Sequence, residues 1–158
     1  MGSRRRGLLR QSTSCGMAMS RIFWDTNLFI YLFEDKGERS ERVSALRQRM
    51  IEREDELLTS ALTLGEILIK PKKMGNDKLA QFYELAISAA ATVLPFDSPA
   101  ALKFAEIRQD RSIQAPDAIQ LACASVARAD LFITNDNRLT KKNIHGIQFI
   151  QSLENAVL

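Results

Sequence analysis

The sequence predicts a three-layer α/β/α domain whose central sheet is mostly parallel and has about five strands. Short apolar runs alternate along the chain with longer segments in which apolar residues recur at helical spacing. Such alternation is typical of parallel strands joined by helices that pack on both faces of a sheet. The length of 158 residues is that of one domain, and no segment repeats another.

The first elements follow from apolar runs and their spacing. Residues 22–24 form an apolar run that ends at an aspartate, which predicts a buried strand, and the apolar residues 28–33 predict a short helix. Over residues 38–53 the apolar positions recur at helical spacing among charged ones, as in an amphipathic helix. Residues 57–59 are the second predicted strand.

Two helices are expected between the second and third strands. Ser60 is a typical N-cap residue, and the helix after it is expected to end at Pro71, because the residue before a proline avoids helical geometry. The second helix is expected over residues 77–90, with Phe82, Leu85, Ala86 and Ala89 on one face.

The second half of the chain continues the alternation. Residues 92–94 are the third predicted strand, and Asp-Ser-Pro at 97–99 signals the start of a helix. Pro116 begins another helix with an apolar stripe. The fourth and fifth strands are expected at residues 131–133 and 147–150.

The net charge of +3 does not indicate a general basic surface for nucleic acids. Five of the 22 basic residues lie within residues 1–21, which contain no acid, so the rest of the chain has 17 basic and 19 acidic residues. The apolar runs are much shorter than the roughly 20 residues that a membrane-spanning helix needs, so no membrane span is expected.

Residues 1–20 are interpreted as a disordered leader, either an over-long start or a tag-like extension, and residues 21–158 as the folded domain. The leader lacks the apolar segment of a secretory signal, although its arginine- and serine-rich composition leaves an organelle transit peptide open. Two distant cysteines and one histidine provide neither a disulfide framework nor a zinc site. A reducing compartment, the cytoplasm, is therefore expected.

Four acidic residues fall where a parallel sheet would present the carboxyl ends of its strands, which is where such sheets bind ligands. They are Asp25, Glu66, Asp117 and Asp136. Each one alone also fits a turn, a helix or the first turn of a helix. Clustered carboxylates repel one another, however, and a hard divalent cation such as Mg²⁺ or Mn²⁺ relieves this repulsion. Sites of this kind often serve phosphoryl chemistry, because the ion lowers the pKa of a water molecule.

Four segments around these acids resemble the four motifs of the PIN domain. They read Trp-Asp-Thr-Asn-Leu-Phe-Ile-Tyr at 24–31, Leu-Gly-Glu at 64–66, Pro-Asp-Ala-Ile-Gln-Leu-Ala at 116–122 and Phe-Ile-Thr-Asn-Asp at 132–136. The resemblance covers residues 21–152, and its first and third segments are the most specific. In its small single-domain form the chain is most similar to the VapC-type toxins of toxin–antitoxin pairs.

The resemblance implies an endoribonuclease that hydrolyses RNA phosphodiester bonds with Mg²⁺ or Mn²⁺ as its cofactor. It also implies a homodimer and a small antitoxin protein as partner. Carried over residue by residue, the catalytic and metal-binding residues would be Asp25, Glu66, Asp117 and Asp136, with Asn27 and Thr134 as supporting polar residues. Asp136 belongs to the most variable motif, and Asn135 or Asn137 is an alternative in its role.

Binding of RNA phosphates requires some positive charge near this site. The candidates, which also fit solvated helix ends, are Lys70, Lys72, Lys73, Arg138, Lys141 and Lys142. An antitoxin helix would lie in a groove formed by the helices expected over 28–33 and 38–53, with an antitoxin arginine near the acidic pocket. His145, the single histidine, is interpreted as a turn residue outside the site.

Other classes of protein also place acids after strands. A phosphatase of the haloacid dehalogenase type would need a second aspartate where the chain has Asn27, and a receiver domain would need an acidic pair near the first strand. Among PIN-like proteins, the alternatives are an RNA-processing nuclease that is not a toxin and a non-catalytic RNA-binding or scaffold domain. Retention of all four acids argues against the non-catalytic domain, because unused clustered carboxylates repel one another.

Overall fold

The computed structural model describes residues 19–34 and 37–158. Its five strands are all parallel and lie in the order β3-β2-β1-β4-β5, which confirms the predicted fold class. The strands are β1 (Arg21–Trp24), β2 (Glu56–Ser60), β3 (Thr92–Leu94), β4 (Leu131–Thr134) and β5 (Phe149–Ser152). The predicted leader, apart from Met19 and Ser20, lies outside the described residues.

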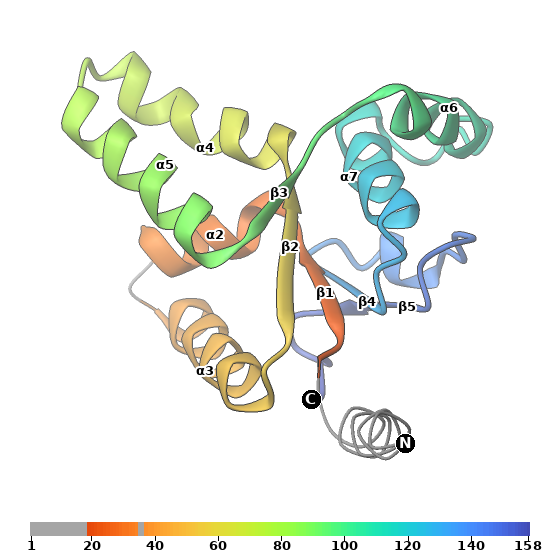
Figure 1. Ribbon diagram of the computed structural model, residues 1–158, viewed down its shortest axis with the longest axis horizontal. Coiled ribbons are helices and arrows are strands. Elements are labelled where there is room, and N and C mark those ends of the chain that lie inside the picture. The colour runs from red at the N-terminus through yellow and green to blue at the C-terminus, as the bar shows by residue number, and fades with distance from the viewer. Residues whose placement is uncertain (1–18, 35–36) are drawn as a thin grey trace, which may run out of the picture.

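Helices cover both faces of this sheet (Figure 1). They are α2 (Thr26–Phe33), α3 (Glu38–Arg53), α4 (Ala61–Lys73), α5 (Asp77–Ala90), α6 (Ser98–Ile107), α7 (Ala115–Val126) and the 3-10 helix η1 (Leu139–Lys141). Side chains alternate between the faces of a strand. Ile22 and Trp24 join the core formed with α2, α3 and α5, whereas Phe23 joins the core formed with α6 and α7. Burial on both faces explains why the strands are continuous apolar runs.

The helix α4 does not end at Pro71, contrary to the prediction. The helix continues to Lys73. Just after it, the N–H group of Met74 donates to the carbonyl of Lys70, and the N–H group of Asn76 donates to the carbonyl of Pro71. Pro71 lies in the last turn of the helix and is buried. Proline lacks a backbone N–H, so the helix loses one hydrogen bond at this position. The other hydrogen bonds of the last turn and the packing of Pro71 remain, and the helix continues past it.

The face of α5 that carries Phe82 and Leu85 is not the one that enters the core. Phe82 and Leu85 are 57% and 62% exposed, whereas Ala80, Tyr83 and Ile87 are buried. The helix carries two apolar stripes at helical spacing, and periodicity alone does not distinguish them. The packing of α5 against α4 and β3 determines which stripe is buried.

The fifth strand begins two residues later than expected. The N–H group of Ile147 donates to the carbonyl of Ile144 at 3.0 Å within a turn, so this residue is not available for the sheet. Pairing starts where Phe149 lies opposite Leu131.

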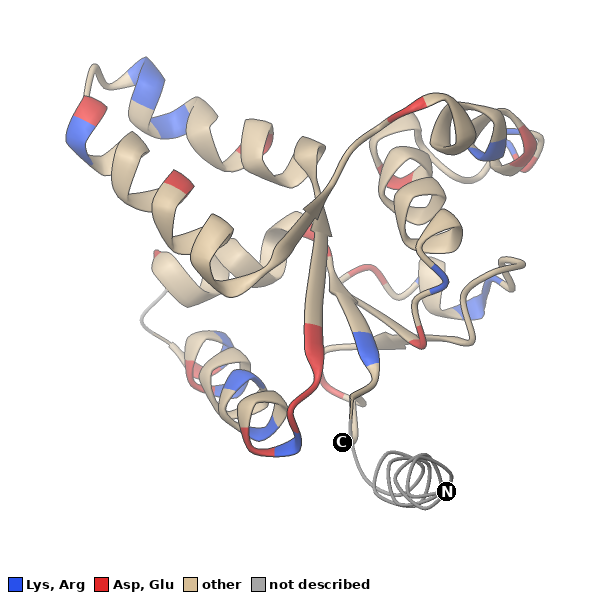
Figure 2. Cartoon of the chain, in the orientation of Figure 1, with Lys and Arg blue, Asp and Glu red and all other residues tan. Residues whose placement is uncertain are grey.

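Acidic and basic side chains are intermixed on the surface of the described residues. Figure 2 shows both signs on α3 and at the joined ends of α4 and α5. This distribution agrees with the near balance of charges expected for the chain after its first residues. None of the helices in the described ranges is both long enough and apolar enough to cross a membrane.

Candidate active site

Asp25 lies at the carboxyl edge of the sheet, between β1 and α2. It is the N-cap of α2, and its Oδ1 accepts a hydrogen bond from the backbone N–H of Asn27 at 3.1 Å. The parallel pairing of β1 with β4 places Thr134 beside it, and Thr134 Oγ1 donates to Asp25 Oδ2 at 2.6 Å. Two elements therefore hold Asp25 in one orientation. Of the two predicted supporting residues, Thr134 makes this contact through its side chain and Asn27 through its backbone.

Burial raises the pKa of Asp25 from 3.8 to about 6. The Thr134 hydroxyl and the backbone N–H groups of Asn135, Leu28 and Asn27 lower it, but they do not cancel the effect of burial. The ionised carboxylate is therefore destabilised in the protein. A cation in contact with it would remove this penalty.

Glu66 and Asp117 bring two more carboxylates to the same pocket. Glu66 lies in α4 and Asp117 in the first turn of α7, and both line a pocket of about 340 Å³ together with Asp25. Other residues that line it are Thr26, Asn27, Ile30, Ile69, Lys70, Pro116 and Gln120. Burial raises the pKa of Asp117, and the negative charges of Asp136 and Glu66 raise it further.

Asp136 stands apart from the other three predicted acids. It is not one of the residues that line this pocket. Its two carboxylate oxygens accept hydrogen bonds from Nε and Nη2 of Arg138 at 3.1 and 2.9 Å. Arg138 thereby lowers the pKa of Asp136. The charge of Asp136 still reaches Asp117, so this carboxylate lies near the pocket but is engaged by a neighbour.

The pocket is acidic, but its side chains do not form a finished metal site. Within residues 19–34 and 37–158, no group of three or more Asp, Glu, His or Cys side chains is arranged to hold a metal ion as it stands. The chemistry of the lining nevertheless fits a hard divalent cation, because carboxylate oxygens are its preferred protein ligands. Burial is the main cause of the raised pKa values of Asp25 and Asp117, so the charged forms of both carboxylates are disfavoured.

Sequence reasoning missed a buried polar network behind Glu66. Thr26 Oγ1 donates to Glu66 Oε1 at 2.7 Å, and Gln120 Nε2 donates to Thr26 Oγ1 at 3.0 Å. Gln120 is 3% exposed and lies among buried apolar residues of α7. A polar residue inside the apolar stretch of a motif was the available signal for this network.

Among the predicted phosphate-binding residues, Lys70 is the one that lines the pocket. Its side chain is 68% exposed, and its ammonium lies 3.7 Å from Oε2 of Glu34. Lys72 and Lys142 form ion pairs with acids elsewhere on the surface.

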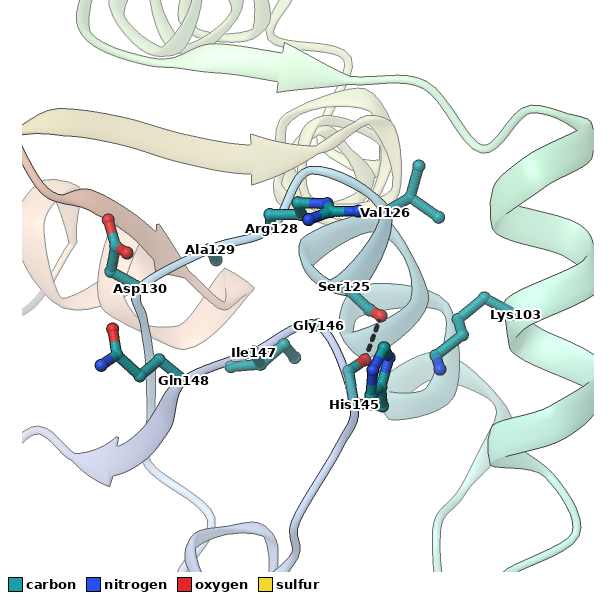
Figure 3. Close-up of a pocket in the computed structure, with 10 residues that line it drawn as sticks. All are labelled: Lys103, Ser125, Val126, Arg128, Ala129, Asp130, His145, Gly146, Ile147 and Gln148. Carbon is teal, nitrogen blue, oxygen red and sulfur yellow. Dashed lines mark hydrogen bonds between the residues drawn. The ribbon is translucent and has the colours of Figure 1, made fainter.

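A larger pocket of about 570 Å³ lies at the opposite edge of the sheet (Figure 3). It is lined by Asp130 and Gln148, which precede β4 and β5, and by His145. The carbonyl of His145 accepts a hydrogen bond from Ser125 Oγ at 2.5 Å. His145 lies in a turn, as expected, and is not among the residues that line the acidic pocket.

The parallel sheet and the pocket at its carboxyl edge define an α/β protein with a candidate ligand site at the edge where such sheets commonly bind ligands. Comparison with known proteins identifies the family. The PIN domain model matches residues 22–144. The chain therefore belongs to the PIN domain family. No curated protein matched the chain.

The solved structures similar to this chain include three toxin–antitoxin complexes. A toxin–antitoxin complex from Klebsiella pneumoniae has 25% sequence identity and a TM-score of 0.59, with 81% of this chain and 95% of that chain covered. VapBC2 from Rickettsia felis, bound to a DNA fragment from its promoter, has 14% identity and a TM-score of 0.63, with 83% and 97% covered. DNA-bound VapBC from Salmonella typhimurium has 23% identity and a TM-score of 0.66, with 85% and 99% covered.

Proposed function

We propose that this PIN-domain protein is the toxin of a VapBC-type pair, a metal-dependent endoribonuclease that hydrolyses phosphodiester bonds in RNA. One observation carries the proposal. Asp25, Glu66 and Asp117 come from three separate parts of the chain and line one pocket at the carboxyl edge of the sheet. The similarity to toxin–antitoxin complexes supports the assignment to the toxin class rather than to RNA processing.

Asp25, Glu66 and Asp117 would hold Mg²⁺ or Mn²⁺. Asp136 would join them if its carboxylate left Arg138 and contacted the ion instead. When bound, the ion supplies a water of lowered pKa and neutralises charge on the phosphate. The protein contributes the orientation of the carboxylates. Thr134 donates a hydrogen bond of 2.6 Å to Asp25. This bond restricts the Asp25 side chain before the ion binds, so less conformational freedom is lost on binding.

We infer that two basic side chains, Lys70 and Arg138, contact the RNA backbone. Lys70 lines the pocket, and Arg138 lies beside Asp136 with a side chain that is 72% exposed. Phosphate contacts of this kind add affinity that falls with salt and carry no base preference. The proposed RNA substrate is consistent with activity in the cytoplasm, which is part of the proposal.

The proposed protein partners are a small antitoxin and a second copy of this chain. Exposed apolar side chains on α4 and α5, among them Ile69, Phe82 and Leu85, are suited to such contacts because their burial removes apolar area from water. We propose that a helix of the antitoxin packs against α2 and α3, two helices that contact each other.

The test is cleavage of a mixed RNA pool by the metal-free protein, with and without added Mg²⁺ or Mn²⁺. Cleavage is expected with metal, is expected to stop with EDTA, and is expected to be lost in Asp25→Asn. Asp97→Asn is the matched control, because Asp97 caps α6 away from the pocket and asparagine is an equally good cap. Cleavage that survives in Asp25→Asn would show that another nuclease is responsible or that Asp25 is not in the active site.

A second experiment separates a toxin from a processing nuclease. Induced expression of the wild-type chain is expected to arrest growth, and Asp25→Asn is expected to have no effect. Co-expression of the proposed antitoxin, a small protein encoded next to the gene for this chain, is expected to restore growth. Normal growth with active wild-type protein would favour the RNA-processing alternative.

A further inference from the structure

A chain of hydrogen bonds connects the end of β2 with the carboxylate of Glu66. Ser60 Oγ donates to Gln120 Oε1 at 2.5 Å, and Gln120 Nε2 donates to Thr63 Oγ1 at 2.8 Å and to Thr26 Oγ1 at 3.0 Å. Thr26 Oγ1 then donates to Glu66 Oε1 at 2.7 Å. The chain thus joins β2, α2, α4 and α7 in the wall of the pocket, which Thr26, Glu66 and Gln120 line.

The direction of these bonds follows from the chemistry of the groups. An ionised Glu66 can only accept, so the single hydroxyl proton of Thr26 must point to it. Thr26 Oγ1 must therefore accept from Gln120, which means that the side-chain amide presents nitrogen to Thr26 and oxygen to Ser60. Thr63 Oγ1 lies 3.1 Å from Thr26 Oγ1 and has a proton left to donate to it.

Gln120 is suited to this position because it offers two donors and an acceptor on one rigid amide. It is 3% exposed, and Ser60 and Thr63 are fully buried, so none of their polar groups can rely on bulk water. Ser60 also serves this network, although it occupies the N-cap position of α4. Its side chain makes no capping bond to α4 and is used by Gln120 instead.

We propose that Gln120 is a positioning residue for the active site, which acts through the Thr26 hydroxyl to orient Glu66 toward the pocket. This inference rests on the proposed function. Gln120 does not touch the ion or the RNA in this role. The Gln120 amide donates to one lone pair of Thr26 Oγ1. This bond fixes the direction of the Thr26 proton, which in turn holds the Glu66 carboxylate. Partners of this kind typically change metal affinity or activity by about 10- to 100-fold when they are removed.

The experiment measures Mn²⁺ affinity by calorimetry and RNA cleavage in Gln120→Met, which keeps the size of the side chain and removes its polar groups. A fall in Mn²⁺ affinity of about 10- to 100-fold is expected, with a matching loss of cleavage. Ser125→Ala is the matched control. Ser125 is a buried polar residue of the same helix, but it bonds to His145 at the opposite edge of the sheet, and its loss is expected to leave Mn²⁺ affinity unchanged.

A double-mutant cycle tests the route through Thr26. If Gln120 acts through this hydroxyl, Gln120→Met is expected to cause no further loss of Mn²⁺ affinity in a Thr26→Val background, because coupled residues are non-additive. Additive losses, or a folded Gln120→Met protein that binds Mn²⁺ as tightly as wild type, would overturn the inference.

A second variant applies if Gln120→Met does not fold. Gln120→Glu keeps the shape and the acceptor for Ser60 but removes the amide donors, so Mn²⁺ affinity is expected to fall. An affinity equal to or above that of wild type would contradict the inference. Wild-type protein that neither binds Mn²⁺ nor cuts RNA would instead refute the proposed function itself.

Discussion

Replacing Asp25 with asparagine is expected to stabilise the metal-free protein at neutral pH while it abolishes cleavage. Burial raises the pKa of Asp25 from 3.8 to about 6. Each pKa unit corresponds to about 1.4 kcal/mol, so the ionised side chain destabilises the fold by about 3 kcal/mol. Asparagine carries no charge, but its amide replaces the strong bond from Thr134 with a weaker one, at a loss of about 1 kcal/mol. The net gain in the free energy of unfolding is expected to be about 2 kcal/mol.

The pH dependence of this gain has a definite sign. Because the pKa of Asp25 is higher in the folded than in the unfolded protein, the folded state binds more protons between about pH 4 and pH 6. The stability contributed by neutral Asp25 is therefore complete below about pH 4 and is lost as the pH rises to 6. The variant lacks this titration, so its advantage over wild type should appear across this window and remain constant above it.

Urea unfolding in EDTA, measured from pH 4.5 to 7.5, provides the assay. Asp97→Asn serves as the control, because it changes an aspartate that caps α6 and is expected to show no such pH-dependent gain. Mn²⁺ at 100 times its dissociation constant should stabilise wild type by about 2.7 kcal/mol and the Asp25→Asn variant by less. An Asp25→Asn protein that is less stable than wild type at pH 7 without metal would refute the reasoning.

Three further substitutions or probes test other parts of the structure. Lys70→Met is expected to raise KM for RNA at unchanged kcat and to reduce the salt slope of binding by about 0.7, the value for one single-strand phosphate contact; an unchanged slope would remove Lys70 from the RNA site. Burial raises the pKa of Cys123 to about 11, so little of its thiol is ionised at pH 8. In a Cys15→Ser protein, alkylation of Cys123 at pH 8 is therefore expected to be slow until urea unfolds the chain. Rapid labelling of the folded chain would contradict this expectation. Gly146→Ala is expected to lower stability by about 1–3 kcal/mol in urea titrations, because φ is +99° and an added Cβ would lie 2.5 Å from Ser125 Oγ; wild-type stability would show that this turn relaxes freely.

Local patterns predicted most of the secondary structure. Apolar runs marked the strands, helical spacing marked the helices, and Asp97 caps α6 as expected. Such signals survive because they depend on residues close together in the sequence. The placement of Asp25 also follows from local information, since an aspartate directly after a strand lies at the carboxyl edge of a parallel sheet.

The sequence by itself thus determined the alternation of strands and helices, the parallel sheet and the family motifs that carry Asp25, Glu66 and Asp117. The tertiary structure decided which of the two apolar stripes of α5 is buried and that Asp136 is engaged by Arg138. It also decided the raised pKa of Asp25 and the bonds that Gln120 makes in the wall of the pocket, because burial and contacts between distant segments exist only after the chain has folded.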